Sequence, residues 1–417
     1  MRAILPLYLT TAMHFAKEDA GQLYSWFKAA CYALPLLGGF LADRYFGKYR
    51  TIVAFSIPYV LGHFVLGLEN TAAVIIALIL LAGGSGVIKP NISTLMGETY
   101  DQQRPGQTQL RSAAFMWFYF AINVGALIST LALPALRDKY GYAVAFQFPA
   151  WLMVLSLGVF AAGKRFYAVE SLEQPTLTHE QQAERWTAIG KLFGVFGMIT
   201  LFWIPYEHMD SVWVFFTRDY VELPTISYLD FNREWQSYQM PPDQLQFINP
   251  LCVMIFAPLF ASLFPKIDPT GRLFTDRFKI LLGLGIGTLA SAVMTIAGFL
   301  ATADTKISVM WLVVSYVLLT IGEVLVYGTG LDLAFSAAPK DMKGFVTGCF
   351  LLTMTAANFF NGFWVRYYDG GMPSESPGGS SFSPPVFFAL SGLFAVLATA
   401  LMAFVNLEEK QPKPATS

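Results

Sequence analysis

The feature that most constrains this chain is a series of long apolar segments separated by short polar loops. A helix needs about 20 apolar residues to cross a hydrocarbon core of about 30 Å. In lipid a helix also satisfies its own backbone hydrogen bonds. Apart from the first, which is too short to cross alone, every segment is long enough. We therefore expect an all-α membrane protein with about twelve helices, at 3–14, 21–42, 51–68, 71–96, 111–133, 142–163, 188–212, 246–265, 279–301, 308–337, 344–367 and 385–406.

Composition and motifs exclude several other classes. Only 13% of the residues are charged, against about a quarter in soluble domains. The net charge of −1 indicates no nucleic-acid partner. The three cysteines, Cys31, Cys252 and Cys349, lie in apolar segments without disulfide or metal spacing, so we interpret them as small core residues. We find no nucleophile–base pair, phosphate loop or cleavable signal peptide, and we expect neither an enzyme nor a metal or organic cofactor.

The distribution of Lys and Arg predicts the orientation in the membrane. Seventeen of them fall in the loops of one side and seven in the loops of the other. Because cytoplasmic loops carry the excess of positive charge, the richer side is expected to be cytoplasmic, together with the C-terminus. Short loops and the lack of a targeting signal favour a bacterial inner (plasma) membrane.

The longest polar connection on the cytoplasmic side divides the spans into six and six. Two six-helix bundles joined in this way are typical of transporters built from repeats, in which substrate binds between the halves near the membrane midplane. The expected parts are the first bundle, the linker, the second bundle and a cytoplasmic tail, at 1–165, 166–186, 187–406 and 407–417. We interpret 217–245 and 369–385 as outside loops.

Short motifs identify a family. The loop "GGFLADRYFGKYR" at 38–50 resembles the G-x-x-x-D-R-x-x-G-[RK]-[RK] loop of the major facilitator superfamily, in which Asp43 and Arg44 would serve a gate. "FYFAINVG" at 118–125 resembles the F-Y-x-x-I-N-x-G signature of the proton-dependent oligopeptide transporter family. Further blocks resemble that family at 83–91, 202–208, 246–250 and 322–339. The resemblance implies the major facilitator fold and import of di- and tripeptides together with protons.

The family's first span carries an E-x-x-E-R motif that this sequence lacks. "MRAILPLYL" resembles the tail of that span, which would place Arg2 in the middle of a helix, where it would pair with a carboxylate and contribute to substrate binding. The short first segment points the same way, and we expect a misassigned start codon rather than a real truncation.

Charged groups inside a bilayer are costly and usually line a pathway. Arg2 and Lys89 lie in the first half, whereas Glu207 and Glu323 lie in the second. A peptide with a carboxylate at one end and an ammonium at the other suits this asymmetry. By resemblance, Glu323 holds the peptide amino end, and Lys89 acts in binding the peptide carboxylate or in coupling. Glu207 is the candidate proton site, since burial disfavours an ionised carboxylate.

Tyr32, Asn123 and Asn249 match pocket positions of the family, and Trp203 lies one helical turn before Glu207 on the same face. Three of the four have a structural alternative, because a Trp packs well in a core and an Asn can join two helices by a hydrogen bond. The alternatives for the charged candidates are an ion pair for Glu323 and snorkelling to the interface for Lys89. Tyr327 and Phe350 stand where the family usually has Ser and Trp, so we expect Tyr327 to narrow the cavity.

Two other functions stay open. The same fold carries nitrate and other anions in plant relatives, although a retained Glu323 would repel an anion. A transport-dead, peptide-binding paralogue is the second alternative, supported only by the absent E-x-x-E-R motif.

Overall fold

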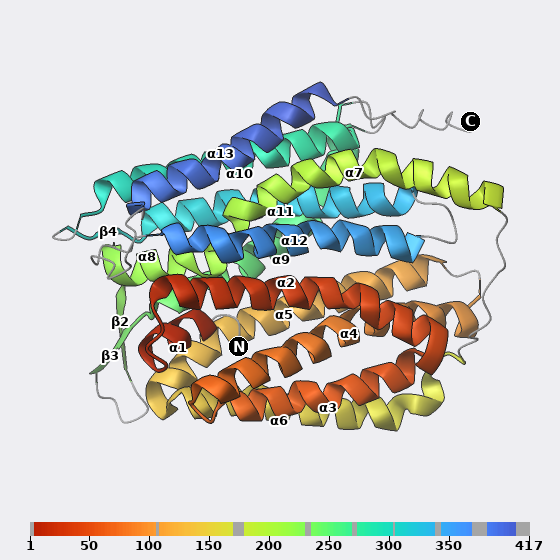
Figure 1. Cartoon of the computed structure of the whole chain (residues 1–417), viewed down its shortest axis with the longest axis horizontal. Helices are drawn as coiled ribbons and strands as arrows, with labels where there is room; N and C mark the ends of the chain where they lie inside the picture. Colours follow the sequence, from red (N-terminus) through yellow and green to blue (C-terminus); the bar gives the residue numbers. More distant parts are fainter. Residues whose placement is uncertain are drawn as a thin grey trace. The chain divides into compact units, whose positions relative to one another are not determined.

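A computed structural model of the chain describes residues 4–105, 108–169, 179–229, 235–268, 273–302, 305–337, 343–368 and 382–405. Within these ranges nearly all ordered structure is helical (Figure 1). The chain divides into two compact units, one comprising 1–183 with 354–365 and the other 184–353 with 366–417. The predicted boundary at 166–186 stays a prediction, because residues 170–178 lie outside the described ranges.

The first unit contains six helices along the first part of the chain. They are α1 (Leu5–Thr11), α2 (Lys17–Leu41), α3 (Lys48–Leu66), α4 (Thr71–Gln103), α5 (Thr108–Tyr140) and α6 (Tyr142–Ala162). A π-helical turn, η1 (Ala42–Phe46), joins α2 to α3, and a 3-10 turn, η2 (Gly163–Phe166), follows α6. In Figure 1 α3 and α4 lie side by side, and each also packs against another helix, α3 against α6 and α4 against α2.

Glycine allows the closest helix approaches, as small residues do at interfaces within membranes. A Cβ on Gly84 of α4 would lie 2.9 Å from the Phe55 carbonyl oxygen of α3, and closer still to Tyr59. A Cβ on the adjacent Gly83 would meet only open space. The α3–α4 pair therefore depends on glycine at 84 and not at 83.

The second unit contains α7 (His179–Glu207), α8 (Val212–Tyr220), α9 (Ile248–Ile267), α10 (Asp276–Leu300), α11 (Met310–Ala337), α12 (Lys343–Trp364) and α13 (Pro384–Phe404). The last turns of α12 cluster with the first unit. Two 3-10 turns, η3 (His208–Asp210) and η4 (Pro242–Phe247), precede α8 and α9, and a third, η5 (Val365–Tyr367), follows α12. Helix α10 packs against both α11 and α13.

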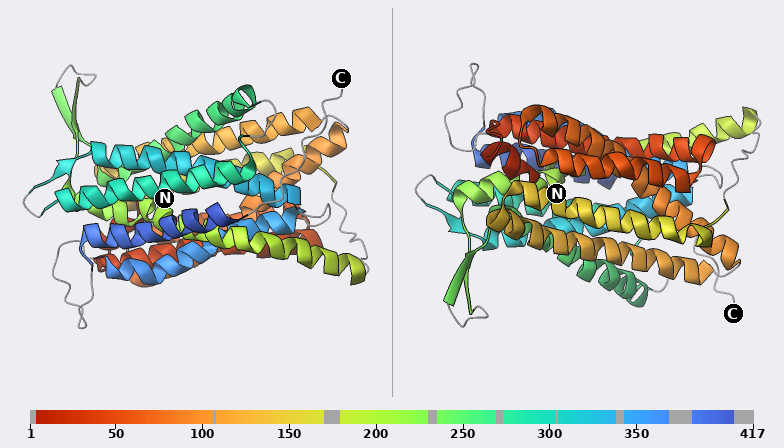
Figure 2. Two further views of the ribbon diagram at one scale, coloured as in Figure 1. Left: turned by 90° about the horizontal axis from the view of Figure 1, so that it is seen from above. Right: turned by 90° about the horizontal axis from the view of Figure 1, so that it is seen from below.

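The segment interpreted as an outside loop at 217–245 holds regular structure. It contains the end of α8, the strand β1 (Val221–Glu222), and the antiparallel pair β2 (Thr225–Leu229) and β3 (Trp235–Gln239). Strand β1 pairs in parallel with β4 (Ile307–Ser308). Figure 2 shows the β2–β3 hairpin extending away from the helices of its unit. The loop interpretation missed these elements because short, mostly exposed strands carry little apolar periodicity.

The helices confirm the predicted spans with differences mainly at their ends. Eight helices in the described residues are long and apolar enough to cross a membrane. Helices α2, α7 and α12 have the length but are less apolar. Among their polar residues are Lys28 in α2 and Asn358 and Asn361 in α12. These three side chains are buried, which fits polar groups that face the interior of a bundle. Helix α1, with seven residues, is short as predicted.

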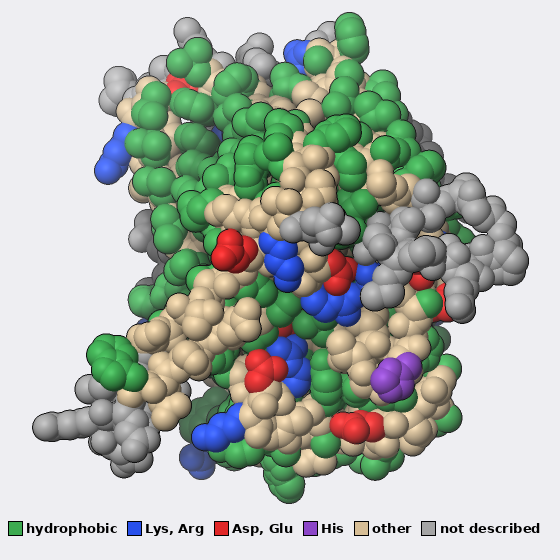
Figure 3. All heavy atoms as spheres, turned by 90° about the vertical axis from the view of Figure 1, so that its left-hand side faces the viewer, with side chains coloured by type: hydrophobic (Ala, Val, Ile, Leu, Met, Phe, Trp, Pro, Cys, Tyr) green, Lys and Arg blue, Asp and Glu red, His purple; other side chains and the backbone are tan. Residues whose placement is uncertain are grey.

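Two smaller expectations can be compared with the structure. Cys31, Cys252 and Cys349 are buried and form no disulfide, which confirms their interpretation as core residues. The interpretation of 217–245 as a segment beyond the membrane suits the face that carries β2 and β3, which presents charged side chains of both signs (Figure 3).

Candidate functional site

The polar group at the centre of the second unit is the carboxylate of Glu323, on α11. Its side chain is partly buried in the middle of a helix that is mostly apolar. Asn249, near the start of α9, donates from Nδ2 to Glu323 Oε2 over 2.6 Å. The Tyr206 hydroxyl, on α7, is in hydrogen-bonding contact with the same carboxylate. Three helices therefore supply one polar site.

A second hydrogen bond orients the Asn249 amide. Its Nδ2 also donates to Thr320 Oγ1 over 3.1 Å, and Thr320 in turn donates to the Tyr316 carbonyl over 2.8 Å. Thr320 lies one helical turn before Glu323, so both present to the same side of α11. The amide of Asn249 thus bridges two groups of α11 and fixes the direction from which another donor can reach Glu323.

Two further carboxylates lie near Glu323. Glu207, the last residue of α7, and Asp210 of η3 both interact electrostatically with the Glu323 carboxylate. Glu207 is only 3% exposed. Several carboxylates close to one another favour a bound cation and disfavour an anion. An ammonium group is the chemical complement of this arrangement.

Aromatic side chains pack together on the neighbouring turns of α7, α11 and α12. Trp203, fully buried on α7, donates from Nε1 to Thr353 Oγ1 over 3.1 Å, and Thr353 donates to the Phe350 carbonyl. The ring of Tyr327 lies 6.3 Å from Trp203 and 5.6 Å from Phe350, between centroids. The two residues that depart from the family pattern, Tyr327 and Phe350, therefore pack together beside Trp203.

The remaining candidates belong to the first unit or lie outside the described residues. Tyr32 is partly buried on α2, Asn123 is buried on α5, and Lys89 is exposed on α4. Arg44 is exposed in η1; the side chain of Asp43 and the whole of Arg2 lie outside the described part of the chain. Their roles in substrate binding and gating stay predictions.

Sequence reasoning missed several members of the site. Thr320 and Tyr206 were not singled out, although Thr320 stands three residues before Glu323, a spacing that places both on one helix face. No local signal joins Asn249 to Glu323, which are 74 residues apart. Lys28, for which the sequence offers no explanation, is 2% exposed and its Nζ lies 5.7 Å from the centre of the Tyr24 ring.

The fold and these residues can be compared with known proteins. The sequence profile of the POT family matches residues 49–179 and 168–374, which together cover most of the chain. The chain belongs to the POT family. It is 29% identical to human solute carrier family 15 member 2 over 70% of this chain and 45% of that protein. It is 25% identical to dipeptide and tripeptide permease A of Escherichia coli K12 over 87% of this chain and 79% of the permease.

Membership of the POT family agrees with the fold. The crystal structure of the POT family transporter PepTSo superposes with a TM-score of 0.78 at 26% identity, over 97% of this chain and 93% of that one. The predicted class, an all-α membrane protein of the major facilitator fold, is thereby confirmed. So is the prediction that it is not an enzyme, because POT proteins are membrane transporters. The chain spans about half the length of the first curated relatives that it matches.

Proposed function

We propose that this POT family member is a symporter that imports di- and tripeptides with protons by alternating access. The observation that carries the proposal is the carboxylate of Glu323 on α11, inside the second unit. Asn249 and Tyr206 are hydrogen-bonded to it. An anionic group held in this way suits the ammonium end of a peptide. The names of the relatives support the substrate class, since one is a dipeptide and tripeptide permease.

Peptide length suits a two-sided site. A di- or tripeptide spans roughly 7–11 Å in extended form. The acidic side would be Glu323 with its neighbours, and the cationic side would be Lys89, with Arg2 in addition. Tyr32, Asn123, Trp203 and Asn249 would line the site, and Asp43 and Arg44 would act in the gating loop.

Protons would drive the transport. Glu207 is the proposed proton site, because it is buried at the end of α7 and interacts with the Glu323 carboxylate. Neutralising one of two interacting carboxylates changes the potential at the other, which couples proton binding to the affinity for an ammonium group. We also propose that the protein lies in the plasma (inner) membrane with its C-terminus in the cytoplasm, as the excess of Lys and Arg on that side predicts.

Uptake of labelled dialanine into proteoliposomes with an inward proton gradient tests the proposal. Accumulation above that of protein-free liposomes, abolished by an uncoupler and reduced by unlabelled trialanine but not by nitrate, is the expected result. Uptake that ignores the uncoupler would contradict proton coupling. Nitrate uptake without dialanine uptake would contradict the substrate class, and dialanine binding without any uptake would favour a peptide-binding paralogue.

A further inference from the structure

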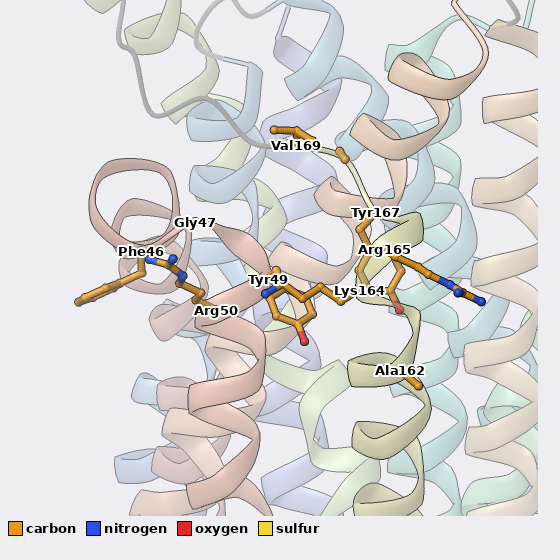
Figure 4. Close-up of a pocket in the computed structure, with 10 residues that line it drawn as sticks. Phe46, Gly47, Tyr49, Arg50, Ala162, Lys164, Arg165, Tyr167 and Val169 are labelled. Atoms are coloured by element: carbon orange, nitrogen blue, oxygen red, sulfur yellow. The ribbon is translucent and has the colours of Figure 1, made fainter.

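A cavity of about 830 Å³ lies in the first unit, at the ends of α3 and α6 on the side that the charge distribution predicts to be cytoplasmic (Figure 4). None of the candidates for substrate binding is among the described residues that line it, and the proposed gating residues Asp43 and Arg44 closely precede the first of these in the chain. Its walls come from the start of α3 and from the end of α6 with the residues that follow, and it is lined by Phe46, Gly47, Tyr49, Arg50, Ala162, Lys164, Arg165, Tyr167, Ala168 and Val169.

Side chains of α4 hold one wall of the cavity in place. Gln102 makes two hydrogen bonds with the backbone of Val169, donating over 2.8 Å and accepting over 2.9 Å. Thr99 Oγ1 accepts from the Ala168 amide over 3.1 Å, and Gln103 donates to the Phe166 carbonyl. The segment after α6 is thus tied to a neighbouring helix at three points, so the wall is part of the fold.

Three aromatic rings pack together at the cavity, and two of them, Tyr49 and Tyr167, line it. Phe160 stacks on Tyr167 with centroids 4.9 Å apart and on Tyr49 with centroids 5.4 Å apart. These rings rest on a buried core of Ile52, Ile88 and Leu95. The Tyr167 hydroxyl donates to the Phe160 carbonyl over 3.0 Å. Burial raises the pKa of Tyr167 above its usual value, so this ring stays neutral and adds no negative charge.

The cavity has one sign of charge. Figure 4 shows Lys164 extending toward Tyr49, whereas the Arg165 side chain points away from this pair. The Arg165 guanidinium lies 4.7 Å from the centre of the Phe166 ring. The Lys164 Nζ lies 5.2 Å from the centre of the Tyr49 ring. Arg50, Lys164 and Arg165 all line the cavity, and no carboxylate is among the described residues that do so. The nearby Lys48 is different, because it forms a salt bridge of 2.9 Å with Glu98.

An exposed apolar stripe leads to the cavity along α6. Leu152, Leu155 and Val159 are 52%, 66% and 68% exposed, and Ala162, which lines the cavity, continues the series. Their spacing of three or four residues places them on one face of the helix. Helix α6 is among those apolar enough to cross the membrane, so this stripe suits contact with acyl chains.

We propose that the cavity binds the phosphate headgroup of an anionic phospholipid, whose acyl chains lie along Leu155 and Val159. Cations at the membrane–water boundary attract the phosphate, and basic pockets between helices on the cytoplasmic side are suited to anionic headgroups. The apolar stripe is what favours a lipid over a soluble phosphate, because a soluble anion makes no use of it. The proposal does not depend on what the protein transports.

Native mass spectrometry of the delipidated full chain, titrated with phosphatidylglycerol and separately with phosphatidylcholine, tests this site. Lys164→Gln should lower phosphatidylglycerol occupancy about fivefold, the effect of one cation near an anionic surface. Ala162→Phe should lower it at least as much, because the larger ring fills the cavity without changing the charge. Lys266→Gln is the matched control: Lys266 is an exposed lysine on the same predicted side, at the end of α9.

Specific outcomes would overturn the proposal. One is an equal loss of phosphatidylglycerol occupancy in Lys266→Gln and Lys164→Gln, which would show that the lipid is attracted by charge alone. Others are equal binding of the two lipids, unchanged occupancy in Lys164→Gln, and displacement of bound lipid by millimolar inorganic phosphate, which would identify a soluble-anion site. Size-exclusion chromatography of each variant checks that it is folded.

Discussion

Single residues of the second unit show how a membrane protein holds an acidic side chain among its helices. Glu323 is hydrogen-bonded to an amide and a hydroxyl from two other helices. Asn249 is itself held by Thr320. Such a network costs stability when one member is removed and a partner is left unsatisfied. Because such a loss of stability could be mistaken for a loss of transport, each substitution here needs a measurement of folding beside the measurement of transport.

At Glu323 we predict a loss of transport with the fold retained. Glu323→Gln keeps a hydrogen-bond acceptor for Asn249 but removes the charge that would bind an ammonium group. Dialanine uptake should fall by roughly one to two orders of magnitude, the worth of a hydrogen bond to a charged group. Glu222→Gln removes an exposed carboxylate from β1 of the same unit and should leave uptake unchanged. Undiminished peptide uptake in Glu323→Gln would remove Glu323 from the binding site.

At Thr353 the predicted effect is on stability. Thr353→Val keeps the shape but leaves the buried Trp203 Nε1 donor without its acceptor. The cost of such a donor is about 1–3 kcal/mol. Thermal unfolding in detergent should therefore show a Tm lower by a few degrees. Thr353→Ser retains the acceptor and should lose less; an unchanged Tm in Thr353→Val would mean that this hydrogen bond does not contribute.

Between helices, small residues set the spacing. In the second unit a Cβ on Gly322 of α11 would lie 2.8 Å from the Gly283 carbonyl oxygen of α10. Gly322 directly precedes Glu323, so the close approach of α10 also sets the position of the candidate site. The α3–α4 contact at Gly84 is the corresponding close approach in the first unit. The adjacent Gly83 provides the control for a test of this contact.

Gly84→Ala should destabilise the protein and Gly83→Ala should not. The added methyl at 84 meets the backbone of α3, which cannot move without separating the two helices. Overpacking of this kind costs typically about 1–3 kcal/mol. Thermal unfolding of both variants in the same detergent measures the difference, and the open space at 83 makes that variant the control. Equal Tm values would show that α3 and α4 are not packed as described.

For the whole molecule, the open question is its direction in the membrane. The excess of Lys and Arg predicts that the end with Lys266 faces the cytoplasm and the end with Lys306 faces outward. Both side chains are exposed, and the natural cysteines at 31, 252 and 349 are buried, which keeps background labelling low.

Cysteine labelling decides this orientation. Lys306→Cys should react with a membrane-impermeant maleimide in intact cells, whereas Lys266→Cys should react only after the cells are permeabilised. The physical reason is that the reagent does not cross the hydrocarbon core. The reverse pattern would invert the topology, and with it the leaflet in which the proposed lipid site lies.

The sequence alone determined the class, the number and approximate position of the spans, the family and the identity of the charged candidates. Hydrophobicity and short motifs are local properties, and a helix that must satisfy its own backbone in lipid can be located from them. Only the tertiary structure decided that Asn249 and Tyr206 reach Glu323 and that Tyr327 packs beside Trp203. It also decided that α4 side chains hold the segment after α6, which lines the cavity. Those contacts join residues far apart in the chain, and packing between helices selects them from many that the sequence pattern permits.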